Sequence, residues 1–550
     1  MAGSKLVHNF AQIPWMEVPR SSFSRSHGHK LTMDAGLLYP IYTDEYLPGD
    51  TFNCSITVFG RMSNATVVPF MDNLYCDIQC FSVPYRLVWE HWKNMNGEQR
   101  SPGDTTDYQV PQVVAPTGGF GVDSVYDHMG VYPWASGLSV SALFGRAYCL
   151  IWNEWYRDEN LQDWVNFNYG DGPDNASTFK LLPRGKRHDY FTSCLPWAQK
   201  GDPVDLPIGG QAKVNVMGNG KTLGLIDGTN GFGIGGATVS NTSLVGIHGT
   251  AGSSVGSAYP AGTPSNMNGR FWGVDTNPSL SGLTGTVDIS GVSALPVNLV
   301  RQAFAAQRVL EKDARGGTRY TEMIRTHFGV VSPDARQQRP EYIGGGTVML
   351  SVNPITQTSS TDSTSPQGNL AAQVTMANTR TNFTKSFTEH GCIICLASIR
   401  ADLTYQQGTN RMFFRKNRLD FYLPSLSHLG EQAVLDREIY TTGVADSDNA
   451  VFGYQEAWAD YRYYPSIITG KMRSKTQGAP SDYLSLDVWH LAQKFENKPT
   501  LSGQFIQENP PLERVMSVQN EPQFIVDVQV RCKAVRPLPV YSVPGLVDHF

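Results

Sequence analysis

Strict alternation of apolar and polar residues at both ends of the chain is the feature that most limits its fold. The pattern covers residues 52–58, 74–80 and 524–532. Because successive side chains of a β-strand point to opposite faces, each segment predicts a strand with one strongly apolar face. Strands separated by hundreds of residues indicate one sheet system that distant parts of the chain close, as jelly rolls do.

A single mainly β core is therefore expected, built from residues before about 201 and after about 295. Residues 392–405 form a fourth candidate strand, more buried at its start. Helical spacing of apolar residues predicts a few helices, at residues 143–164, 300–314 and 320–328. These helices lie between strand regions, as insertions in a β-framework would.

The segment from about 202 to 294 differs from the rest of the chain. Residues 201–300 hold 21 of the 53 glycines, and residues 228–269 contain no Asp, Glu, Lys or Arg. Disorder is one interpretation. Val, Ile and Leu recur throughout, however, so we favour an ordered β-rich surface insertion that packs against its symmetry mates in an assembly.

Charge and cysteine content limit the function. The net charge is −5, although a protein that coats a polyanion alone is expected to be basic. If the protein encloses DNA, a small basic packaging partner is therefore expected. Eight cysteines in 550 residues are too sparse for a disulfide scaffold, so all eight are predicted to be free. We predict neither a signal peptide nor membrane insertion, because no apolar run approaches the length of a membrane helix.

One charge cluster predicts a contact with single-stranded DNA. Residues 411–418 interleave cations with aromatic rings, which suits phosphate binding and base stacking; the alternative is a solvated or ion-paired loop. The predicted contacts are Arg411, Phe413, Phe414, Arg415, Lys416 and Arg418. A second basic segment, near the N-terminus, is expected to line an interior or clamp a neighbour through Arg20, Arg25, His27, His29 and Lys30.

No motif predicts a catalytic, metal or cofactor site. Short matches to phosphate-loop, dinucleotide and nucleophile-elbow patterns lack the strand and helix that those patterns need. Cys392 and Cys395 stand in an apolar strand pattern, where core packing is favoured over metal or redox chemistry. Glu154, Asp158 and Glu159 suit acid–base chemistry, but ion pairs on a helix surface are the default.

Several long segments resemble the major capsid protein of microviruses, specifically the gokushovirus branch. The similar segments are residues 151–161, 187–197, 301–304, 313–320, 327–329, 339–344, 452–456 and 486–491. The resemblance implies an eight-stranded antiparallel viral jelly roll with large loop insertions. It also implies a T=1 icosahedral shell of sixty copies around circular single-stranded DNA.

The same resemblance places residues 202–294 in a protrusion at the threefold axes, a candidate feature for attachment to a host surface receptor. The expected location is the virion, assembled in the cytoplasm of a host bacterium, and no enzymatic activity is expected. Two alternatives remain. One is a β-sandwich that binds or cleaves carbohydrate, which as an enzyme would need paired carboxylates at a cleft. The other is a scaffold without DNA contact.

Overall fold

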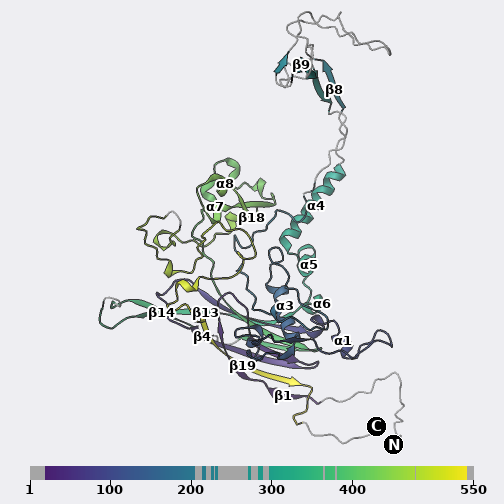
Figure 1. Cartoon of the computed structure of the whole chain (residues 1–550), viewed down its shortest axis with the longest axis vertical. Helices are drawn as coiled ribbons and strands as arrows, with labels where there is room; N and C mark the ends of the chain where they lie inside the picture. The colour runs from purple at the N-terminus through teal and green to yellow at the C-terminus, as the bar shows by residue number, and fades with distance from the viewer. Residues whose placement is uncertain are drawn as a thin grey trace, which may run out of the picture. The chain divides into compact units, whose positions relative to one another are not determined.

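The computed structural model describes residues 19–202, 204, 213–218, 224–227, 230–232, 270–273, 283–288, 297–362, 366–377, 381–476 and 479–541 (Figure 1). The chain forms two compact units. Unit 1 comprises Met1–Gly201 and Leu310–Phe550, and unit 2 comprises Asp202–Val309.

Unit 1 is built on one ten-stranded antiparallel sheet with the order β1-β19-β4-β14-β13-β5-β16-β3, in which β2 also pairs with β19 and β15 with β4. The N-terminal strands are β1 (Ser21–Ser24), β2 (His27–Met33), β3 (Tyr39–Tyr46), β4 (Thr51–Met62) and β5 (Leu74–Pro84). The others are β13 (Glu341–Thr356), β14 (Leu370–Ala377), β15 (Thr381–Ser386), β16 (Gly391–Ala401) and β19 (Phe524–Arg536). This curled sheet confirms the predicted antiparallel jelly roll, with ten strands instead of eight.

The alternating segments form the strands predicted for them. In β4 and β19, every second side chain is buried in the main core, among them Phe52, Ile56, Phe524 and Val528. Strands β5 and β16 are buried on both faces because a second core covers their other side. Along β16, Ile393 and Cys395 enter the main core, whereas Cys392 and Ile394 enter the second one.

Helix α3 (Leu143–Ile151) packs in the second core and continues as a π-helical turn through Trp152–Tyr156. The prediction of a helix to residue 164 is wrong, because Arg157 is extended with ψ 135°. Asp158 then accepts backbone hydrogen bonds from Asn160 and Leu161, which stabilises a turn instead. Helices α4 (Val297–Gly316) and α5 (Tyr320–Phe328) confirm the two other predicted helices.

Shorter elements complete unit 1. The helices are α1 (Trp92–Met95), α2 (Val125–His128), α6 (Asp334–Gln337), α7 (Asp436–Ile439), α8 (Ala445–Asp448) and α9 (Ala459–Arg462). Two small antiparallel pairs join β6 (Gln112–Val114) to β7 (Ser139–Ser141) and β17 (Glu431–Leu435) to β18 (Val451–Glu456). A third core, which includes Phe191, Val434 and Phe452, supports β17 and β18.

In unit 2, β8 (Lys213–Gly218) pairs with β12 (Leu283–Asp288). Strand β9 (Gly224–Asp227) lies between β10 (Asn230–Phe232) and β11 (Arg270–Gly273). Most of the predicted insertion, including its charge-free centre, lies outside the described residues. The β-rich cap formed with symmetry mates therefore stays a prediction.

The prediction that all eight cysteines are free is wrong for four of them. Disulfides join Cys54 to Cys532 and Cys80 to Cys395, with Cα–Cα distances of 4.1 and 3.9 Å. The reason is strand register: each pair stands directly opposite on neighbouring antiparallel strands. The other four cysteines are free and buried, namely Cys76, Cys149, Cys194 and Cys392.

Candidate functional site

The basic–aromatic segment, residues 411–418, follows β16 in the chain and leads toward β17. Its first half is a 3-10 helix, Arg411–Phe414, capped by the Asn410 side chain, which accepts a hydrogen bond of 3.0 Å from the Met412 N–H. Arg411 reaches β17, which the third core supports, because its guanidinium donates to the carbonyl of Ala433 at 2.9 Å.

Two of the predicted DNA contacts are held by carboxylates of the same chain. Arg411 lies 3.5 Å from Glu438, whose side chain is 3% exposed. Burial raises the pKa of Glu438, while the charge of Arg411 opposes that rise. Arg415 pairs with the buried Asp460 and lies 4.1 Å from the ring centroid of Tyr461. For these two arginines, the ion-paired alternative describes what the structure shows.

Three other members of the segment are exposed to solvent. Phe413 is 70% exposed, and Lys416 and Arg418 are also exposed. Among the described residues, neither of these two cations has a side-chain hydrogen bond or ion pair. Phe414 is covered, because the guanidinium carbon of Arg437 lies 4.0 Å from its ring centroid. A free cation–aromatic surface therefore rests on Phe413, Lys416 and Arg418.

The structure adds exposed aromatic rings that sequence reasoning missed. Phe421 and Tyr461 flank Arg415 and are about half exposed, and Tyr463 and Tyr464 are more exposed still. The signal in the sequence was the run Tyr461-Arg-Tyr-Tyr, which lies too far along the chain to be joined to residues 411–418 by pattern alone. Because the cation that Phe421 and Tyr461 flank is ion-paired with Asp460, these rings add exposed surface for base stacking but no free cation.

The five residues of the predicted arm lie in or beside strands of the chain's own sheet. Arg20 donates to the carbonyl of Gly49, and Arg25 pairs with the buried Asp44. His29 contacts the carbonyl of Ile41 at 3.0 Å, and Lys30 lies 3.4 Å from Asp527. His27 and Lys30 are exposed in the first part of β2, whereas Leu31 and Met33 of the same strand are buried. These residues are not a free arm, and their place in an interior or at a neighbour stays a prediction.

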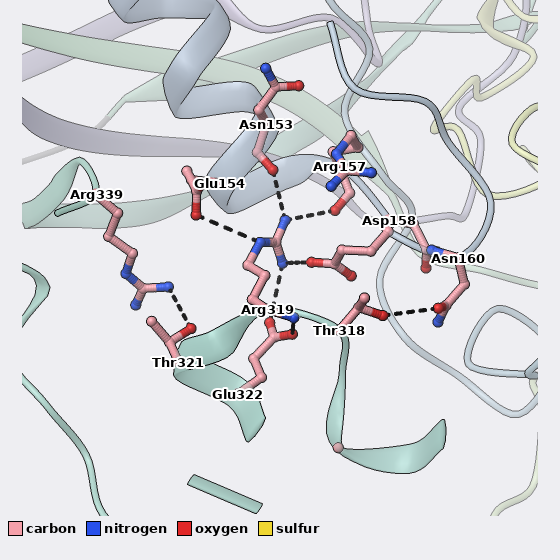
Figure 2. A network of polar contacts seen from close by, with 12 residues as sticks. Asn153, Glu154, Arg157, Asp158, Asn160, Thr318, Arg319, Thr321, Glu322 and Arg339 are labelled. Carbon is pink, nitrogen blue, oxygen red and sulfur yellow. Dashed lines mark hydrogen bonds and ion pairs between the residues drawn. The ribbon is translucent and has the colours of Figure 1, made fainter. Parts of the chain in front are cut away.

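A second polar site centres on Arg319, at the start of α5 (Figure 2). Its guanidinium donates to the backbone carbonyls of Asn153 and Arg157 at 2.9 and 3.0 Å. It also contacts three carboxylates, those of Glu154, Glu159 and Glu322. The Arg319 side chain is 15% exposed, and burial lowers the pKa of its guanidinium. Through these hydrogen bonds and ion pairs, the Arg319 guanidinium joins the start of α5 to the π-helical turn.

This Arg319 network lies beside the two points where the chain leaves and re-enters unit 1. The Lys200 N–H donates to the carbonyl of Leu310 at 3.3 Å, and the Lys200 ammonium donates to Thr318 at 3.1 Å. Thr318 in turn donates to Asn160 (Figure 2). Gly317, with φ 90°, allows the turn between α4 and α5. These hydrogen bonds therefore hold the segment that leaves unit 1, at Lys200, next to the segment that returns to it, at Leu310.

A cavity of about 1070 Å³ borders the same network. Its lining includes seven Arg and Lys side chains and three carboxylates, and several of these cations are already neutralised: Arg184 by Asp77, Arg315 by Glu431, and Arg319 as above. Of the three candidate acid–base residues, Glu154 and Glu159 are ion-paired with Arg319. The third, Asp158, accepts hydrogen bonds from the backbone N–H groups of Asn160 and Leu161. These contacts stabilise the fold.

The described ranges contain no group of three or more His, Cys, Asp or Glu side chains suited to hold a metal ion. No described helix combines the length and apolar character of a membrane span.

Comparison with known proteins covers nearly the whole chain. The profile of the family described as Capsid protein (F protein) matches residues 11–546. Capsid protein VP1 of Bdellovibrio phage phiMH2K is 43% identical over 552 aligned positions, and the match covers 99% of this chain and 98% of that protein. Capsid protein VP1 of Chlamydia phage 1 is 40% identical over 99% and 98% of the two chains. Capsid protein VP1 of Spiroplasma virus 4 is 36% identical over 98% of each.

Proposed function

Because the chain belongs to the Capsid protein (F protein) family, we propose that it is the major subunit of a T=1 icosahedral shell that encloses a circular single-stranded DNA genome. The observation that carries the proposal is similarity to phage capsid proteins from end to end, with 36% identity or more over at least 98% of each chain. A jelly roll with exposed aromatic and apolar loops suits the repeated contacts of a closed shell.

The first test is to express the chain in bacteria and image the purified product by electron microscopy, where closed particles of sixty copies are expected. In particles purified from infected host cells, which also supply the genome and the packaging partner, nuclease-protected nucleic acid should be circular and sensitive to a nuclease specific for single strands. Small oligomers without particles, or protected double-stranded DNA, would contradict the proposal.

We assign the DNA contact to the exposed part of the basic–aromatic segment, Phe413, Lys416 and Arg418. Replacing Lys416 and Arg418 with Gln should lower the DNA content of particles and leave their yield unchanged, because neither side chain supports the fold. The matched control is the pair Arg100→Gln and Arg336→Gln, two exposed arginines elsewhere. Equal DNA content in both double variants would show that Lys416 and Arg418 do not contact the DNA.

The negative net charge of −5 supports a second component in the particle, a small basic DNA-packaging protein. Such a partner would neutralise phosphates that the shell leaves uncovered. We further propose that the shell assembles in the cytoplasm of the host bacterium and that the protein is then found in the virion.

We also propose that residues 202–294 form the outermost, threefold protrusion and contact a host surface receptor. The support is compositional: many glycines for tight turns and a charge-free centre with scattered apolar residues. Replacing residues 215–285 with a short linker should leave shells intact, whereas attachment to host cells should fall. Loss of the shell would instead make the insertion part of the assembly core.

A further inference from the structure

The hairpin of β13 and β14 extends beyond the sheet to which its base belongs (Figure 1). Strand β13 pairs with β5 from Glu341 to Leu350 and only with β14 from Ser351 to Thr356. Strand β14 reaches β4 only at its far end, from Thr375 to Ala377. Ala372 is bridged to Thr66, so the part of the hairpin beyond it, which starts at the pair Ile355 and Ala371, is the two-stranded ribbon without a third strand. A ribbon of this form is marginally stable in water by itself.

The outer ribbon is uncovered on both faces. Every described residue from 353 to 362 and from 366 to 370 is exposed, except Gln357. Ile355 is 48% exposed and Leu370 is 37% exposed. Ile355 is paired with Ala371, and Leu370 with Thr356, one position further along. Successive pairs point to opposite faces, so each face presents an apolar side chain with no cover from its own chain.

The charge of the ribbon limits what could cover it. From Ser351 to Thr375 the sequence contains no Lys or Arg, and Asp362 is the single acidic residue. A nucleic acid surface needs cations for the phosphates, and these are missing here. Two uncharged faces with unpaired strand edges are instead suited to contact with another protein surface.

We propose that this outer ribbon, residues 355–356 and 366–371, is buried against a second copy of the chain in the assembled shell. A capsid protein meets copies of itself on several sides, so each ribbon has an identical neighbour within reach of the same contact. The inference rests on the proposed shell but not on its DNA content.

The first test replaces Ile355 and Leu370 with Asp. Both side chains are exposed, so the chain should fold with an unchanged thermal midpoint, while the fraction that sediments as particles should fall at least about tenfold. The matched control is Ile355→Val with Leu370→Met, which should assemble normally. Assembly of the Asp variant at the level of the control would overturn the inference.

The second test needs no variant. Hydrogen exchange at residues 355–356 and 370–371 should be at least about tenfold slower in particles made from this chain alone than in dispersed subunits. Equal exchange in the two states, or protection confined to DNA-filled particles, would overturn the inference. Absence of any particle from the wild-type chain would count against the proposed function instead, so the two failures are distinguishable.

Discussion

Replacing Arg319 with Ala tests whether the Arg319 network holds unit 1 together. The change leaves Glu159 and Glu154, whose side chains are 12% and 22% exposed, without their counterion. It also removes the donor to the carbonyls of Asn153 and Arg157. Breaking a buried ion pair by removing one partner costs about 3–5 kcal/mol, and an unpaired buried carbonyl costs about 1–3 kcal/mol. Because these losses are not additive, we expect a total of about 4 kcal/mol.

The assay is urea unfolding of dispersed subunits, followed by tryptophan fluorescence, since Trp155 lies next to Glu154. Arg319→Lys keeps the charge but not the two-pronged donor, so about half of the loss is expected. The control is Arg325→Ala, an exposed arginine on the same helix, with an expected change within about 0.5 kcal/mol. If Arg319→Ala cost no more than this control, desolvation of the guanidinium would cancel its pairing, and the reasoning would be refuted.

Two further predictions concern the cysteines, and a third concerns a buried carboxylate. Digestion of particles without reductant should yield peptides that link Cys54 to Cys532 and Cys80 to Cys395; free, alkylated forms of all four would contradict the pairing. Burial raises the pKa of Cys76 and of Cys149 to about 12, so neither thiol should be alkylated at neutral pH before the chain unfolds. Burial would raise the pKa of Asp77, but Arg184, with hydrogen bonds from Thr347 and Arg400, brings it below its ordinary value. The stability that Asp77 contributes is therefore present above about pH 4 and lost as the pH falls through its folded pKa; an Asp77→Asn variant should lack this part of the acid dependence in urea midpoints.

The strands at the two chain ends were predictable because alternation records a local property, the burial of one face. β4 and β19 therefore follow from the sequence, and α5 follows from helical spacing. Register is different, because it depends on which strands become neighbours. Nothing in the surroundings of Cys54 indicates that Cys532 stands opposite, and the prediction of free thiols was wrong for that reason.

The DNA-contact segment was found by composition, but its partners were not. Arg415 meets Asp460, 45 residues further along, and Arg411 meets Glu438 in α7. A local pattern cannot distinguish a cation reserved for a ligand from one that neutralises a buried acid of its own chain. Ion pairs were the expected default for Glu154 and Glu159, but their partner Arg319 was missed for the same reason, since it lies in a second segment far along the chain.

The position of β19 has a consequence for how the protein is made. This strand lies between β1 and β4 in the sheet, yet it is synthesised last, and Cys532 follows its partner Cys54 by 478 residues. At about 5–20 residues per second, a ribosome needs roughly 25 to 100 seconds to add that stretch. During this time the edge of β4 that will pair with β19 has no partner, and the apolar face of β4 is not fully covered. A chain that stops before residue 524 lacks β19, so β1, β2 and β4 lose the strand with which all three pair, and the sheet of such a chain stays open.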